Sequence, residues 1–183
     1  HLGSETILVI QTAKAATDFF KNHDHSFVDR NINETMRVHD YHQGSLILAP
    51  YGPHWRWLKK LLVTKMLASE RVRESESVRE KCVEDLIRWI DDHGKKAVDV
   101  GRIVLLAEFN LFGNLMVSKD IVEPSLENGS EFFRAMSGVT KWVGTPNVAD
   151  FFPWLRWMDL QGLKKKMEKD MKKVFEIASV LLG

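Results

Sequence analysis

The feature of the sequence that most restricts the fold is the apolar run from Arg102 to Val117. Placed on a helix, this run carries apolar side chains on nearly every side, so the helix must be covered by other parts of the protein. The run is shorter than the roughly 20 apolar residues that cross a bilayer. We therefore predict a buried helix within a mainly α-helical fold.

Amphipathic patterns predict several further helices. Pro53 suits the first position of a helix that runs to about Met66. Ser69 is expected to cap the next helix, which runs to about Asp92 and stops at Gly94. The remaining predicted helices are one from Thr12 to Asn22, one from Glu131 to Val143 and one that starts near Gly162. Because 44% of the residues are apolar, the chain can build a core, and we expect one domain over residues 1–183.

The segments between these helices are predicted as a small β element and several loops. β-branched and apolar residues from Glu5 to Gln11 indicate a strand near the N-terminus, and Ala97–Val100 indicates a second short strand. His23–Pro50 shows no sustained period, so we expect a long loop with room for one short helix. Asp120–Gly129 is predicted as another loop, and Gly144–Gln161 as an irregular segment rich in aromatic side chains.

Charge and cysteine content exclude several classes of function. The formal net charge is +1, from 26 basic and 25 acidic residues, so nothing points to nucleic acid as a partner. The single cysteine, Cys82, excludes an internal disulfide and a multi-cysteine metal site. No signal peptide is recognisable. We expect the sequence to be a fragment at both ends, because it starts at His1 and stops within a helical pattern at Gly183.

The strongest candidate site lies in the run Tyr-Gly-Pro-His-Trp-Arg-Trp-Leu-Lys-Lys that starts at Tyr51. Trp55 and Lys59 are four residues apart, so they share one face of the predicted helix. An indole N–H and an ammonium placed together can bind one anionic group. Arg56 points about 100° away and is not assigned to this site. The alternative is an ordinary amphipathic helix with a buried tryptophan and a solvated lysine.

Five stretches, taken in order, resemble the plant cytochromes P-450. The run from Tyr51 is similar to the family motif Tyr-Gly-Pro-x-Trp-Arg-x-Leu-Arg-Lys, with lysine instead of arginine at position 59. The other similar stretches are Leu2-Gly3-Ser4 before Ile7–Ile10, His23-Asp24 followed by Phe27 and Arg30-Asn31, Asp150-Phe151-Phe152-Pro153, and Asp159-Leu160-Gln161-Gly162. The chain thus resembles an amino-proximal part of that fold, covering the region of helices B to G, in the geraniol 8-hydroxylase-like subfamily.

This resemblance implies a haem-thiolate monooxygenase. The family's tryptophan and arginine bind a haem propionate, which places Trp55 and Lys59 as cofactor-binding residues. Lys59 keeps the charge of arginine but loses its planar, two-pronged donor geometry. The family's oxygen-activating helix and its cysteine loop are not found in this sequence. Cys82 lies in a charged helix without the residues of that loop, so we assign no catalytic or metal-ligating residue to this chain.

The resemblance also implies a substrate, partners and a location for the intact protein. Val38–Ala49 corresponds to a loop over the distal haem face, with Leu46, Ile47 and Leu48 as candidate substrate-binding residues. The alternative is that these three only pack the loop. The implied reaction oxidises a small apolar molecule, with a terpenoid as one candidate, using O2 and electrons from an NADPH–cytochrome reductase. The implied location is the cytosolic face of the endoplasmic reticulum membrane, and the isolated chain is expected to be inactive.

A non-enzymatic helical module that binds partners or a membrane surface is the competing hypothesis. Phe151, Phe152, Trp154 and Trp157 beside Arg156 suit a membrane interface, although they could equally hold the segment in the core. The lysines of the last predicted helix could contact anionic lipid or form a solvated face. The histidine pairs of His23–His42 lack a strong metal-binding spacing, so a zinc site is not favoured. We also expect exposed apolar area and poor solubility.

Overall fold

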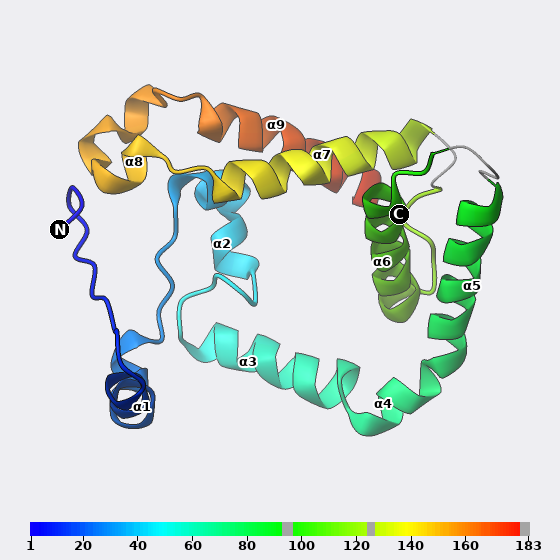
Figure 1. Ribbon diagram of the computed structural model, residues 1–183, viewed down its shortest axis with the longest axis horizontal. Helices are drawn as coiled ribbons and strands as arrows, with labels where there is room; N and C mark the ends of the chain where they lie inside the picture. The colour runs from blue at the N-terminus through cyan, green and yellow to red at the C-terminus, as the bar shows by residue number, and fades with distance from the viewer. Residues whose placement is uncertain (93–96, 124–126, 180–183) are drawn as a thin grey trace. The chain divides into compact units, whose positions relative to one another are not determined.

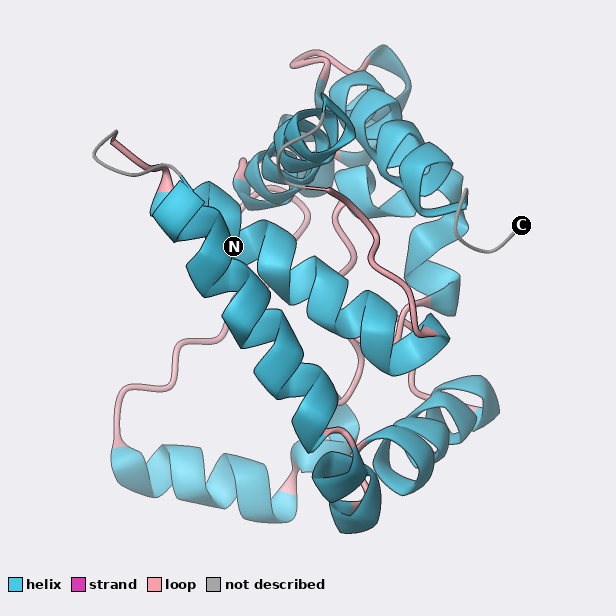
Figure 2. Cartoon of the chain, turned by 90° about the vertical axis from the view of Figure 1, so that its right-hand side faces the viewer, coloured by secondary structure: helices cyan, strands magenta, loops and turns pink. Residues whose placement is uncertain are grey.

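The computed structural model describes residues 1–92, 97–123 and 127–179, and helices make up most of them (Figure 2). These residues form two compact units. The first contains His1–Leu61 and Trp142–Glu168, and the second contains Leu62–Lys141 with the described part of Lys169–Gly183. The long helices α7 (Glu127–Gly144) and α9 (Leu163–Ser179) contribute residues to both units (Figure 1). The predicted mainly α class is confirmed.

Short helices joined by loops make up the first unit. α1 (Ala13–Asn22) begins after Thr12, whose hydroxyl oxygen accepts a hydrogen bond from Ala15 N at 3.2 Å. α3 (Pro53–Leu61) begins at the predicted proline, and a π-helical turn, Leu62–Met66, continues it into the second unit. The other elements are α2 (Tyr41–Gly44), α8 (Val148–Phe151) and 3-10 helices at Asp24–Phe27, Glu34–Asp40 and Pro153–Met158.

The hydrophobic core of the second unit lies between α6 (Val100–Val117), α7 and α9. Leu106, Val122 and Phe132 are buried at its centre, and the ring of Phe109 meets Phe132 edge-on at 4.8 Å. Partly buried residues that pack against them are Ile121, Phe133, Met136, Val174 and Ile177. The unit also contains α4 (Ser69–Glu74) and α5 (Glu76–Asp92), of which α5 packs along α6.

One buried amide fixes the chain that follows α6. Asn110 is 3% exposed, and its side-chain oxygen accepts hydrogen bonds from Ile121 N at 2.8 Å and Val122 N at 2.9 Å. Its amide nitrogen donates to Val122 O at 2.8 Å. Gly113 lets the same segment approach closely, because a Cβ there would lie 2.5 Å from Lys119 O. Asn110 therefore supplies the partners that a neighbouring strand would otherwise give to residues 121–122.

The prediction that α6 is buried is only partly correct. Ile103, Leu106 and Ala107 face the core, but Phe112 and Met116 are 57% and 65% exposed. Part of the apolar surface of α6 is therefore left uncovered by the described residues. The expectation that this run is too short to cross a bilayer is wrong by the measure of length and composition: α6 has 18 residues and a mean hydropathy of 1.4, although the core helix of a soluble protein meets the same measure. The expectation of exposed apolar area is confirmed.

The two predicted strands are not found in the described residues. Glu5–Gln11 is irregular, and the only β pairing described near it is an isolated antiparallel bridge between Leu2 and Glu5. A strand needs a partner along its length, and among the described residues only Glu5, at the edge of the first segment, has a bridge partner. Ser4 N instead donates to Phe151 O at 2.8 Å, and Gly3, with φ +59°, allows that close approach.

Several predicted element boundaries also change. Ala97–Val100 is not a strand, because Val100 begins α6 and the Asp99 side chain caps that helix by accepting from Arg102 N at 3.0 Å. Ser69 lies inside α4 and Ala68 takes the cap position, while a break at Ser75 separates α4 from α5. The predicted stop at Gly94 lies outside the described residues.

The predicted loops contain more helix than expected. His23–Pro50 holds two 3-10 helices and α2, and the irregular segment Gly144–Gln161 holds α8 and one 3-10 helix. α7 begins at Glu127, before the predicted start at Glu131, which shortens the predicted loop Asp120–Gly129. Part of that loop, residues 124–126, lies outside the described residues.

Side chains of the Asp-x-Gln-Gly element close the segment between α7 and α9. Gln161 Oε1 accepts from Val148 N at 2.7 Å, and Gln161 Nε2 donates to Pro146 O at 3.0 Å. The Asp159 carboxylate accepts from Lys164 N at 3.2 Å and Lys165 N at 3.1 Å, so it caps the start of α9. The element therefore has a structural role that its sequence did not reveal.

A buried glutamate joins this segment to the loop before α2. Glu34 N donates to Asp150 Oδ1 at 2.7 Å. Glu34 Oε1 lies 3.0 Å from Arg37 Nε and 2.9 Å from Arg156 Nε, as ionic contacts without hydrogen-bond geometry. Asn33 Nδ2 adds a bond to Val143 O at 3.2 Å. These contacts hold together two stretches of the first unit that are more than a hundred residues apart in the sequence.

Candidate functional site

The helix α3 places Trp55 and Lys59 side by side, as their spacing predicts. Lys59 Nζ lies 5.0 Å from the centroid of the Trp55 ring, within the range of a cation–π contact. Arg56 turns away from this pair and lies 6.0 Å from the centroid of Tyr51. The shared face of Trp55 and Lys59 is thus confirmed.

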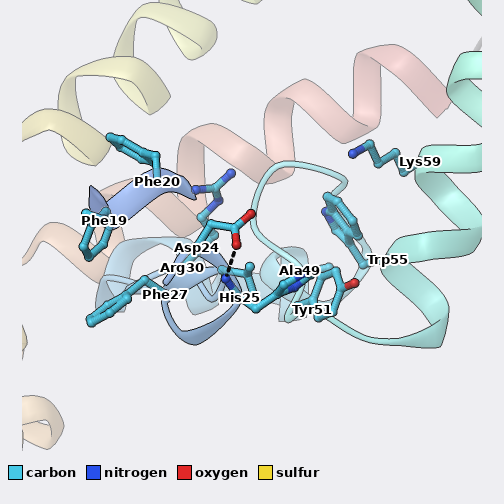
Figure 3. A pocket seen from close by; sticks show the side chains of 11 residues that line it. Phe19, Phe20, Asp24, His25, Phe27, Arg30, Ala49, Tyr51, Trp55 and Lys59 are labelled. Carbon is cyan, nitrogen blue, oxygen red and sulfur yellow. Dashed lines mark hydrogen bonds between the residues drawn. The ribbon is translucent and has the colours of Figure 1, made fainter. Parts of the chain in front are cut away.

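Trp55 and Lys59 both line a cavity of about 400 Å³ that lies within the first unit (Figure 3). This volume falls in the range typical of small-molecule sites. Residues from α1, the 3-10 helix Asp24–Phe27, the segment that follows it and the loop before α3 complete the lining: Phe19, Phe20, Asp24, His25, Phe27, Val28, Arg30, Ala49 and Tyr51. The cavity therefore combines an aromatic side with a polar, cationic one.

Basic groups outnumber acidic ones around the cavity. Lys59 and Arg30 contribute two full positive charges, and Asp24 contributes the one carboxylate of the lining. One oxygen of Asp24 accepts a hydrogen bond from His25 N at 2.8 Å, which is drawn in Figure 3. An anionic group fits this lining better than a cationic one, because ammonium and guanidinium groups are donors without acceptors.

Sequence reasoning missed Arg30 and the phenylalanines as parts of this site. Arg30 lies in the His-Asp … Phe … Arg stretch, whose resemblance to the family implies no role for this residue. Phe19 and Phe27, with ring centroids 4.6 Å apart, form the aromatic side. No periodic pattern relates Arg30 to the helix that carries Trp55, so the sequence held no signal for its place in the cavity.

The indole N–H of Trp55 has a backbone partner in this structure. Trp55 Nε1 donates to Leu46 O at 2.9 Å, which connects α3 to the loop that precedes it. The Trp55 ring also contacts Tyr51, with centroids 5.4 Å apart. Trp55 and Lys59 therefore lie side by side, but the indole N–H of the predicted pair of donors is already engaged by a backbone carbonyl.

The three candidate substrate-binding residues do not share one cavity. Leu46 and Ile47 line a second hollow, of about 590 Å³, together with His39, Asp40, Tyr41, Gly44 and Ser45. Leu48 is half-buried and lines neither this hollow nor the cavity beside Trp55, whereas Ala49 lines the latter. Ile47 is 72% exposed. The structure therefore brings only Leu46, through its carbonyl, into contact with Trp55.

Cys82 and the histidines do not form a site among the described residues. Cys82 lies on α5, where burial raises the pKa of its thiol and the carboxylates of Asp120 and Asp85 raise it further. A thiol of this kind stays protonated and is a poor metal ligand. Within residues 1–92, 97–123 and 127–179, no group of three or more His, Cys, Asp or Glu side chains could hold a metal ion.

Comparisons with known proteins give a consistent family for the whole chain. Residues 1–182 match the family model described as Cytochrome P-450. Cytochrome P-450 76A2 from Solanum melongena is 45% identical over 99% of this chain and 37% of its own length. Iridoid oxidase from Catharanthus roseus is 37% identical over 98% and 36%, and geraniol 8-hydroxylase from Swertia mussotii is 31% identical over 100% and 37%. The chain thus spans little more than a third of the length of these relatives.

Proposed function

Because the chain belongs to the cytochrome P-450 family, we propose that its cavity beside α3 binds the carboxylate edge of a haem. Members of the family depend on haem, whose iron supplies the oxygen-activating chemistry when the group is bound. The observation that carries the proposal is the convergence of Trp55, Lys59 and Arg30 on one cavity. The intact protein would then act as a haem-dependent monooxygenase.

The donor set fits the carboxylates of the haem and does not include a thiolate for its iron. The two cations, Lys59 and Arg30, can hold one or both propionates, and the indole N–H of Trp55 can join them only by leaving Leu46 O. The aromatic side chains of Phe19 and Phe27 offer apolar contact. The one cysteine, Cys82, belongs to α5 and does not line this cavity. We propose that this chain orients the haem by its propionate edge. Because no thiolate lines the cavity, we also propose that the chain alone has no monooxygenase activity.

The proposed substrate is a small apolar molecule of the terpenoid class. Relatives named geraniol 8-hydroxylase, iridoid oxidase and drimenol monooxygenase support this class. The proposed substrate-binding residues are Leu46, Ile47 and Leu48, of which Leu46 and Ile47 line the second hollow. For the intact protein we also propose O2 as co-substrate, an NADPH–cytochrome reductase as electron donor and the cytosolic face of the endoplasmic reticulum membrane as location.

Titration of this chain with haemin tests the cofactor proposal. Lys59→Ala should weaken binding about tenfold, the loss of one charge-assisted contact. Lys60→Ala is the matched control, because it removes the same charge from the next residue of α3 without touching the cavity lining. Equal effects of the two substitutions would contradict the proposal. A thiolate-type Soret band in this chain would contradict the statement that the iron ligand lies elsewhere.

A membrane-surface module is the second candidate function. Its support is the exposure of Trp154 and Trp157, at 64% and 81%, beside the lysine-rich start of α9. Aromatic side chains next to basic ones suit a lipid interface. Flotation with anionic liposomes tests it: binding that disappears when both tryptophans are replaced by alanine would favour this function. Absence of flotation at low salt would remove it.

A further inference from the structure

We infer that Trp55 is a positioning residue that couples occupancy of its cavity to the conformation of the turn Ser45–Ala49. The inference rests on the proposed function of that cavity and extends it to the neighbouring hollow. Its starting point is the bond from Trp55 Nε1 to Leu46 O, because the same indole also faces the cavity with Lys59 (Figure 3).

The turn Ser45–Ala49 is closed by bonds that converge on Ser45. Ala49 N and Leu48 N donate to Ser45 O at 2.7 and 3.2 Å, and Ile47 N donates to Ser45 Oγ at 3.3 Å. Ser45 N in turn donates to Tyr41 O, which attaches the turn to α2. The carbonyl of Leu46 takes no part in this closure and instead accepts from Trp55, so the indole holds the turn against α3.

An indole carries a single donor, which can serve only one acceptor well at a time. A carboxylate beside Lys59 would compete with the neutral Leu46 carbonyl for that donor. Hydrogen bonds to ionised acceptors are roughly twice as strong as those to neutral acceptors, so the indole N–H donates to the carboxylate instead of the Leu46 carbonyl. The Leu46 carbonyl then loses its partner, and the turn is released from α3.

The release stays local because the far end of the loop is held separately. Tyr51 N donates to Asp29 Oδ1 at 2.9 Å, a bond that does not involve the indole. Movement is therefore confined to Ser45–Ala49, where Leu46 and Ile47 line the second hollow. Occupancy of one cavity thus alters the wall of the other through a single exchanged hydrogen bond.

Iron-free protoporphyrin, which carries the two carboxylates without a metal, is the probe that tests this coupling. Its binding is followed by absorbance, and amide hydrogen exchange at Leu48 and Ala49 is followed by NMR. In the unsubstituted chain, saturation with the probe should speed exchange at these amides about fivefold, as expected for the loss of one neutral hydrogen bond. The signal of the Trp55 indole N–H should shift in the same titration.

Two substitutions on α3 separate coupling from simple structural support. Trp55→Phe keeps an aromatic ring beside Tyr51 but removes the donor, so exchange at Leu48 and Ala49 should be about fivefold faster without the probe and should no longer respond to it. Trp57→Phe is the control, since Trp57 is 58% exposed and does not line the cavity. It should behave like the unsubstituted chain in both conditions.

The possible failures can be told apart. If the probe binds and exchange at Leu48 and Ala49 does not change, the coupling is overturned while the proposed cofactor site stands. Normal exchange in Trp55→Phe without the probe would overturn it too, since the indole would then not hold the turn. If absorbance shows no binding of the probe, the proposed cofactor site fails and the coupling fails with it.

Discussion

Replacement of Asn110 by alanine should remove most of the order in the segment after α6. The substitution deletes three hydrogen bonds of 2.8–2.9 Å at a position that is 3% exposed. It leaves Ile121 N and both backbone groups of Val122 without partners in the core. A buried donor or acceptor left without a partner costs about 1–3 kcal/mol, so three such groups cost about 3–9 kcal/mol before relaxation, and we expect about 3–5 kcal/mol after it.

Urea unfolding followed by circular dichroism measures this loss, and amide exchange at Ile121 and Val122 locates it. Glu108→Ala is the matched control, because it lies on the same helix at an exposed position and should change stability by no more than about 0.5 kcal/mol. Asn110→Asp should fall between the two, since its carboxylate keeps both acceptor bonds but adds a buried charge. A loss below about 1 kcal/mol for Asn110→Ala would refute the reasoning.

Three further substitutions or measurements follow from the fold. Glu34→Gln should lower the free energy of unfolding by about 1–2 kcal/mol, because it removes the charge that faces Arg156. Salt screens this ion pair, so thermal melts at two salt concentrations should show a smaller loss at the higher one. Gly113→Ala should cost about 1–3 kcal/mol in urea unfolding, since its Cβ would clash with Lys119 O; a neutral result would contradict the close approach. Alkylation of Cys82 should be slower in the folded chain than in urea, because the pKa of its thiol is raised above the ordinary value of 9.0. The rate in the folded chain should increase as the pH rises past that ordinary value. Equal rates in the folded chain and in urea would contradict the raised pKa.

The helices could be predicted from the sequence because their signals are local. Pro53 starts α3 and Thr12 caps α1, and both act on residues within one turn. The strand predicted at Glu5–Gln11 failed because a strand depends on a distant partner, which local composition does not show. Asp99 was missed as the cap of α6 because the β-branched residues on either side of it favoured a strand over a helix start.

The site was predictable only within one helix. The spacing of Trp55 and Lys59 was enough to place them together, since both lie on α3. Arg30 and Phe19 reach the same cavity from other elements, and no periodic pattern relates them to α3. The bond from Trp55 to Leu46 was equally inaccessible, because it depends on where an irregular loop returns to the helix.

The bonds made by Gln161 and Asp159 also bear on the order in which the chain folds. They join positions only 5 to 15 residues apart, whereas the bond from Glu34 N to Asp150 spans 116 residues. Closing a short stretch costs less entropy than closing a long one, and local contacts form sooner. The stretch from Pro146 to Lys165 should therefore take shape early and by itself. During synthesis, Glu34 leaves the ribosome first and must wait for a partner that is made 116 residues later.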